Sequence, residues 1–126
     1  MDRRMNINLT TAEERLAMLI WRVAPLTSPE LVELANEALS WKKSTTYTIL
    51  KKLCDKGVFK NENANISVVL SQEEQKARQS RRYVEDSFGG SLPNFIASFF
   101  NGRKLTPEQS AEIKRLIEEY EEEAHG

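Results

Sequence analysis

Hydroxyl side chains and lysines make up most of "KKSTTYTILKK", residues 42–52, and this composition suits contact with a polyanion. Short Ser and Thr side chains let a helix approach base edges in a major groove, and lysines beside them reach phosphates. Six lysines and one acid, Asp55, lie between residues 42 and 60. The stretch predicts a DNA-reading surface, with an ordinary solvated helix face as the alternative.

If the segment is helical, its residues separate into two faces. At a helical rotation of about 100° per residue, Thr46, Ile49, Leu50 and Leu53 share one side, which is suited to packing. Hydroxyls and lysines fall on the opposite side, with Tyr47 at its margin. Asparagines in the following turn could contact sugar and phosphate, although they also suit turn geometry. The predicted DNA-binding residues are Lys43, Ser44, Thr45, Tyr47, Thr48, Lys51, Lys52, Asn63 and Asn65.

Two helices are expected before this segment. Thr10 and Thr11 each precede a glutamate by three residues, the capping-box spacing of a helix start. The predicted inward stripe of this helix is Leu16, Leu19, Ile20 and Val23, and the helix should end before Pro25. Ser28 as cap and Pro29 in the first turn open the second helix. Its predicted inward residues are Leu31, Leu34, Ala35 and Ala38.

The segment after the third helix has the pattern of a hairpin. Gly57 suits a left-handed helix end, and residues 58–62 and 66–70 alternate as strands around the turn-rich "ENAN". Three short helices followed by a hairpin predict a mainly α fold with a small β-hairpin. Residues 1–71 are therefore assigned to a winged helix-turn-helix domain that binds DNA.

Residues 72–126 are predicted to form a helical dimerisation region. Ser71 and Glu74 have capping-box spacing, and Gly89 and Gly90 should end the helix that they begin. Apolar residues then repeat at helical spacing with little intrachain surface to cover them, which favours a twofold partner over folding back on the same chain. The predicted dimerisation residues are Val84, Phe88, Leu92, Phe95, Ile96, Phe99, Phe100, Ile113, Leu116, Ile117 and Tyr120.

Composition narrows the function classes. Residues 1–71 carry ten Lys+Arg and eight Asp+Glu, whereas residues 72–126 carry eight and eleven, so the net charge of −1 hides a basic and an acidic half. One cysteine, Cys54, and one histidine, His125, cannot build a structural zinc site or a catalytic set. We therefore expect no enzyme activity, metal or cofactor. No apolar stretch or leader suggests stable membrane association, which predicts a soluble cytoplasmic protein.

The quoted residues also carry a family resemblance. "LTTAEERLAMLIW", "STTYTILKKLCDKGVF" and the following hairpin resemble the penicillinase-repressor family of winged-helix transcriptional repressors, along nearly the whole chain. The resemblance implies a homodimer that represses operons from palindromic double-stranded DNA operators. It places Thr45, Thr46, Tyr47, Thr48 and Lys52 at recognition-helix positions, although the rotation of the helix turns Thr46 inward.

The resemblance also suggests how repression would end. In the penicillinase branch, a membrane sensor protease or a protease downstream of it leads to cutting of an Asn-Phe bond in the dimerisation region. Asn94-Phe95 is the one such dipeptide in this sequence, although the family bond aligns nearer Ser98-Phe99. Phe95 as a simple core residue of the dimer is the alternative.

Two other functions remain open. A winged helix can serve as a protein-protein interaction module, but such a module would tend to expose apolar groups on its third helix, where this one exposes Ser, Thr and Lys. A winged-helix repressor controlled by a small effector is the nearer alternative.

Overall fold

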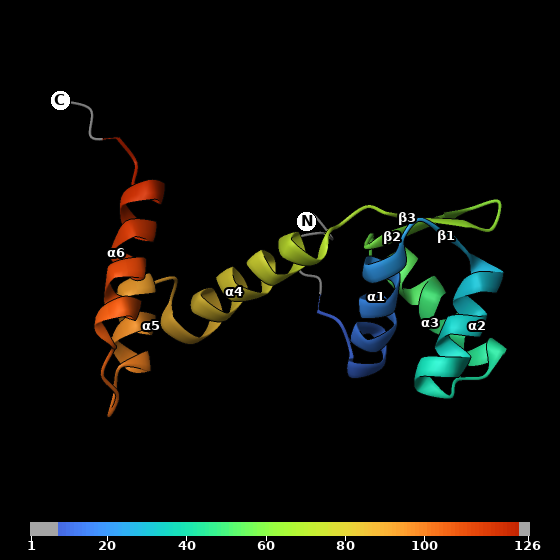
Figure 1. The fold of residues 1–126 in the computed structure, drawn as a ribbon, viewed down its shortest axis with the longest axis horizontal. Helices are drawn as coiled ribbons and strands as arrows, with labels where there is room; N and C mark the ends of the chain where they lie inside the picture. Colours follow the sequence, from blue (N-terminus) through green and yellow to red (C-terminus); the bar gives the residue numbers. More distant parts are fainter. Residues whose placement is uncertain (1–7, 124–126) are drawn as a thin grey trace. The chain divides into compact units, whose positions relative to one another are not determined.

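The computed structural model describes residues 8–123, which form nine helices and strands (Figure 1). The residues divide into two compact units, one ending at Tyr83 and the other beginning at Val84. As predicted, the fold is mainly helical with a small antiparallel sheet. Each unit is described by itself below.

The first helix, α1 (Thr11–Val23), begins at one of the two predicted capping boxes. Thr10 is the N-cap, its hydroxyl accepts from the Glu13 backbone N–H, and the Glu13 carboxylate accepts from the Thr10 N–H. Thr11 already belongs to the helix. The prediction that Val23 points inward is wrong, because this last helical residue is 45% exposed and Ala17 instead completes the buried stripe.

The second helix, α2 (Ser28–Leu39), starts one residue earlier than its predicted cap implies. Thr27 is the N-cap and forms a capping box with Glu30, so Ser28 is the first helical residue and is buried. Thr27 takes this role because a glutamate lies three residues after it, which lets two backbone N–H groups be satisfied reciprocally. The prediction that Ala38 points inward is wrong, because Ala38 lies on the exposed side of the last turn of α2, next to the exposed Glu37.

The third helix, α3 (Lys43–Asp55), has the inward face that the sequence predicts. Thr46, Leu50 and Leu53 are buried, and Ile49 packs against them from a half-buried position. Gly57 follows the C-cap with a φ of 82°, a left-handed conformation that glycine adopts without steric cost. The helix therefore ends where predicted.

The sheet has three strands, one more than predicted. β2 (Phe59–Glu62) and β3 (Asn65–Val68) form the hairpin, and β1 (Leu26–Thr27) pairs antiparallel with β3, giving the order β1-β3-β2. Asn63 and Ala64 make the two-residue turn with φ of 52° and 64°. Two consecutive positive φ values are typical of the turn whose twist matches a hairpin.

One apolar core joins the three helices to the sheet. Leu16 and Ile20 of α1, Leu31 of α2 and Leu53 of α3 are fully buried, and Ile66 of β3 closes the core from the sheet. Trp21 extends this core at its edge, where its ring lies 5.6 Å from that of Phe59. The core fixes the side of α3 that faces inward and leaves the opposite side to solvent.

Helices make up the rest of the chain. α4 (Gln72–Phe88) begins at the predicted capping box and ends before Gly89 and Gly90. In this capping box the Glu74 backbone N–H donates to Ser71 Oγ at 3.1 Å, and the Ser71 backbone N–H donates to the Glu74 carboxylate at 3.2 Å. α5 (Leu92–Phe99) is capped by Ser91. α6 (Pro107–Tyr120) follows the N-cap Thr106, which forms a capping box with Gln109.

Candidate nucleic-acid interface

The outward face of α3 presents the residues that the sequence assigned to DNA. After Lys43, hydroxyls occupy its N-terminal turns and Lys51 and Lys52 follow, so short side chains can approach base edges while longer ones reach phosphates. Thr46 is fully buried, which confirms that it belongs to the packing face. The exposed residues of the outward face are Lys43, Ser44, Thr45, Thr48, Lys51 and Lys52.

The hydroxyl of Thr48 is partly committed within the helix. Its Oγ1 donates to the backbone carbonyl of Ser44 at 2.9 Å, the bond to the preceding turn that threonine often makes in helices. Its proton is engaged there, and its lone pairs and methyl group remain exposed. Thr48 is therefore suited to accepting a hydrogen bond from a base amino group or to contacting a thymine methyl.

Tyr47 differs from its neighbours because it is half-buried. Its hydroxyl lies 3.5 Å from Ser28 Oγ at the start of α2, and Lys43 Nζ lies 6.0 Å from the centre of its ring. The ring thereby joins α3 to α2, a role that the sequence did not reveal for Ser28. A contact between Tyr47 and DNA stays a prediction.

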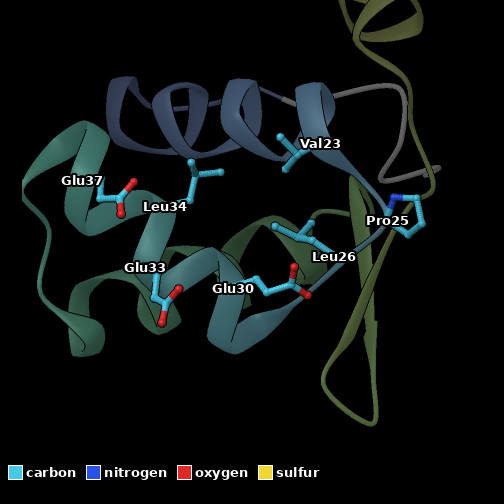
Figure 2. Close-up of a pocket in the computed structure, with 7 residues that line it drawn as sticks. All are labelled: Val23, Pro25, Leu26, Glu30, Glu33, Leu34 and Glu37. Carbon is cyan, nitrogen blue, oxygen red and sulfur yellow. The ribbon is translucent and has the colours of Figure 1, made fainter.

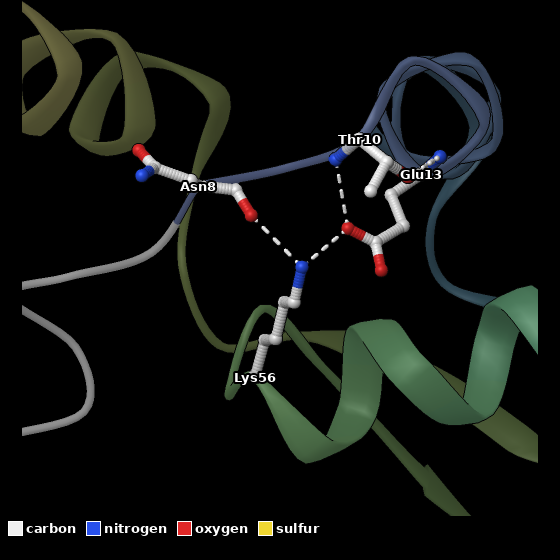
Figure 3. Close-up of polar contacts among 4 residues, drawn as sticks. All are labelled: Asn8, Thr10, Glu13 and Lys56. Carbon is white, nitrogen blue, oxygen red and sulfur yellow. Dashed lines mark hydrogen bonds and ion pairs between the residues drawn. The ribbon is translucent and has the colours of Figure 1, made fainter.

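The basic stretch divides into paired and exposed lysines. Lys56 Nζ donates to the Asn8 carbonyl at 2.8 Å and to the Glu13 carboxylate at 2.5 Å, as Figure 3 shows. Lys60 forms an ion pair of 3.0 Å with Glu62. Two of the six lysines thus have a carboxylate partner, a buried one for Lys56 and an exposed one for Lys60. The exposed lysines on or next to α3 are Lys42, Lys43, Lys51 and Lys52.

Glu13 is almost fully buried, with 2% of its surface exposed. Burial raises the pKa of its carboxyl, but hydrogen bonds from Lys56 and Thr10 and the Lys56 charge together hold that pKa below its usual value. The ionised carboxylate thereby ties the start of α1 to the end of α3.

The predicted wing residues lie at the hairpin turn. Asn63 has a positive φ, and the side-chain amide of Asn65 donates to the Asn63 carbonyl at 3.3 Å. Both residues are exposed. Their local geometry explains asparagine at both positions, and contacts with the DNA backbone stay a prediction.

A cavity of about 390 Å³ lies between α3 and the hairpin, lined by residues that include Tyr47, Lys51, Cys54 and Asn61. The Cys54 thiol is half-buried. Desolvation and the nearby Asp55 carboxylate raise its pKa, outweighing a hydrogen bond with the Asn61 backbone. The thiol therefore stays protonated near neutral pH, which suits a packing residue rather than a redox sensor.

The face of α2 beside α1 has the opposite charge. Figure 2 shows Glu30, Glu33 and Glu37 along α2 around a pocket whose apolar lining includes Val23 and Leu34. α2 contains no lysine or arginine. A DNA backbone would be repelled here and attracted at α3, so the charge distribution selects the outward face of α3 for a polyanion.

Two other classes of site find no support in the described part of the chain. Residues 8–123 contain no cluster of histidine, cysteine and acidic residues able to hold a metal ion, and His125 lies outside these residues. None of the helices between those limits is long and apolar enough to cross a membrane.

The second unit exposes much of its apolar surface. Leu92 and Phe99 of α5 are more than half exposed, as are Ile117 and Tyr120 of α6. Phe88 and Phe95 pack edge to face at 5.5 Å, and Phe99 and Phe100 lie 6.1 Å apart. The half-buried members of the predicted dimerisation set are Val84, Phe88, Phe95, Ile96 and Phe100, and its exposed members are Leu92, Phe99, Ile113, Leu116, Ile117 and Tyr120.

A trihelical unit with a three-stranded wing and a basic outward third helix defines a winged helix-turn-helix protein of the DNA-binding class. Residues 9–119 match the penicillinase repressor family, so the chain belongs to that family. Its members are regulatory DNA-binding proteins rather than enzymes, which makes this chain a transcriptional repressor.

Two relatives extend over most of the chain. The penicillinase repressor of Bacillus licheniformis is 19% identical over 116 residues, covering 89% of this chain and 91% of that protein. An uncharacterized 16.5 kDa protein in the ptsI 3' region of Latilactobacillus sakei is 20% identical over 113 residues. This match covers 86% of this chain and 77% of the Latilactobacillus sakei protein. At these identities the family is shared while individual contacts can differ.

Proposed function

We infer that the chain represses transcription in the cytoplasm by inserting α3 into the major groove of an operator. The observation that carries this proposal is the segregation of α3 into a buried apolar face and an exposed hydroxyl and lysine face. Thr45 and Thr48 would approach base edges, and Lys51 and Lys52 would contact phosphates. An interaction module that buried α3 against a protein would instead need apolar groups on this face.

The operator is proposed to be palindromic and to bind two copies of the chain. Exposed apolar groups on α5 and α6 support this, because matching stripes can pack around a twofold axis and withdraw that surface from water. One winged helix has four exposed lysines on or next to α3. For four phosphate contacts, the logarithm of the binding constant should fall by about 3.6 for each tenfold rise in salt concentration. This salt slope should be about 7 for two copies.

Selection from a pool of random duplexes at several salt concentrations tests this function. A symmetric enriched sequence, bound with a slope near the two-copy value, is expected. A folded protein that enriches no sequence would refute the DNA-reading role of α3. An asymmetric site bound with a slope near the one-copy value would refute the dimer alone.

Proteolytic inactivation is a further part of the proposal and involves the Asn94-Phe95 bond. Asn94 is exposed at the start of α5, and its backbone N–H donates to Ser91 Oγ at 3.1 Å. Phe95 packs on Phe88. Cleavage would therefore require the first turn of α5 to unwind, and it would separate Phe95 from the part of the second unit that precedes it.

A further inference from the structure

A cavity of about 250 Å³ lies between α1 and the first half of α4, away from the groove between α3 and the hairpin. It lies wholly within the first compact unit. Its volume is below the roughly 300–1,000 Å³ of pockets for drug-sized molecules, so an occupant would be no larger than one small ring system. The side chains on its two walls indicate what that occupant would be.

The α4 wall is made of amides. Gln72, Gln75 and Gln79 line the cavity at positions i, i+3 and i+7, which places all three on one face of the helix. Gln75 is 3% exposed and is the one buried residue of α4. An amide carries both donor and acceptor groups, and the group most complementary to it is another amide or a lactam.

The α1 wall is apolar and aromatic. Met18 and Trp21 line it three residues apart, and Leu9 adds an aliphatic group from the segment before α1. The Trp21 indole N–H donates to the Leu70 carbonyl at 2.9 Å, which fixes the ring at the edge of the core. Tryptophan and methionine both make favourable contacts with aromatic rings, so this wall suits a flat aromatic body.

The charges around the cavity balance. Glu14 of α1 and Lys76 of α4 line it, both from exposed positions, and its other lining residues are uncharged. A ligand with a net charge would gain nothing from such a balanced lining, whereas a neutral one meets no unpaired charge.

We propose that the cavity between α1 and α4 binds a small, neutral aromatic amide or lactam, with its ring on Trp21 and Met18 and its amide on the glutamines of α4. The site goes beyond DNA binding and does not depend on it. α4 is the helix that contains residues of both compact units, because the division falls between Tyr83 and Val84. An occupant would therefore bind to the helix that links the two units.

Benzamide and toluene are the paired probes, because they share a ring and differ in the amide. The chain has two tryptophans, so its nitrogen-15 correlation spectrum has two indole N–H signals, and Trp41 provides an internal control outside the cavity. Benzamide should move the Trp21 signal and the side-chain amide signals of Gln75 and Gln79 saturably, with a dissociation constant on the order of 1 mM. Toluene should bind more weakly, and Trp41 should not respond.

Gln75→Leu removes the buried amide and keeps a side chain of similar size. This substitution should weaken the binding of benzamide about three- to tenfold, which is the effect of losing one hydrogen bond. The affinity for toluene should stay the same or increase. Gln79→Leu, at a less buried position, provides a second variant should Gln75→Leu fail to fold.

Three results would overturn the proposal. Benzamide could cause no saturable shift at the Trp21 signal, or toluene could bind the natural chain as well as benzamide does. Movement of the same signals with protein concentration alone would identify a second copy of the chain as the occupant.

Discussion

Replacing Lys56 with methionine tests whether this lysine holds the fold rather than the DNA. Methionine keeps most of the aliphatic stem but removes the charge that meets Glu13 and the donor to the Asn8 carbonyl. A hydrogen bond to a charged group contributes about 1.5–3 kcal/mol, and a fully buried ion pair that loses one partner costs more. The Lys56 side chain is 34% exposed, so in the variant water can partly replace its hydrogen bonds to Glu13 and Asn8. We therefore expect the free energy of unfolding to fall by about 2 kcal/mol.

Urea and thermal unfolding measure this loss. For a domain of this size, about 2 kcal/mol should lower the Tm by about 8–16 °C. Lys60→Met is the matched control, because the Lys60 ion pair with Glu62 is exposed on both sides and should contribute no more than about 0.5 kcal/mol. Equal stability of the two variants would refute the assignment of Lys56 to the fold.

The pH dependence follows from the carboxylate that Lys56 contacts. The pKa of Glu13 in the folded chain lies below its usual value of 4.5, so ionised Glu13 stabilises the fold above that pH. This contribution should be lost as the pH falls below about 4.5 and through the folded-state pKa. Glu13→Gln lacks the ionisation, so its stability deficit relative to the natural chain should be largest near neutral pH and shrink in acid. A deficit that stays constant from neutral pH into acid would refute the ion pair.

Three further predictions concern DNA, assembly and cleavage. Thr48→Ala should change the preferred base at one operator position, whereas Lys51→Ala should weaken all duplexes alike and lower the salt slope by about one; identical behaviour in binding titrations would contradict this division. Ile117→Lys should yield a monomer in light scattering with unchanged helical content, because it places a charge in the apolar stripe, and a persistent dimer would move the interface elsewhere. Mass spectrometry of the intact protein after exposure to the inducing signal should show cleavage after Asn94 in the natural chain and no cleavage in Asn94→Gln. An uncut natural chain would refute cleavage at the Asn94-Phe95 bond.

Local sequence signals predicted most of the fold. The capping box at Ser71 and the left-handed end at Gly57 depend on neighbours within a few residues, and both are confirmed. The predicted start of α2 is off by one residue, because Thr27 and Ser28 are both good N-cap residues. Glu30, three residues after Thr27, decides in favour of Thr27 because it completes a capping box. β1 has two residues, too few for any periodicity, and its pairing with β3 depends on the tertiary fold.

The composition of the site was predictable, while the roles of individual side chains were less so. Helical rotation alone separated Thr46 from the exposed hydroxyls. It could not distinguish Lys56 from Lys51, because Glu13, the partner of Lys56, lies 43 residues away along the sequence. The contact of Tyr47 with Ser28 is likewise long-range. A count of lysines from sequence therefore overstates the basic surface.

The separation of charge explains how a chain with a net charge of −1 can act on DNA. Charges in salt solution act over about 8–10 Å, so a duplex responds to the local surface rather than to the sum over the chain. At α3 that surface is lysine and hydroxyl, whereas the α2 face beside α1 carries three glutamates (Figure 2). A duplex that approached this acidic face of α2 would be repelled. In the proposed complex the glutamates of α2 would therefore help to orient the winged helix on DNA and would limit non-specific binding, an effect that a uniformly basic domain would lack.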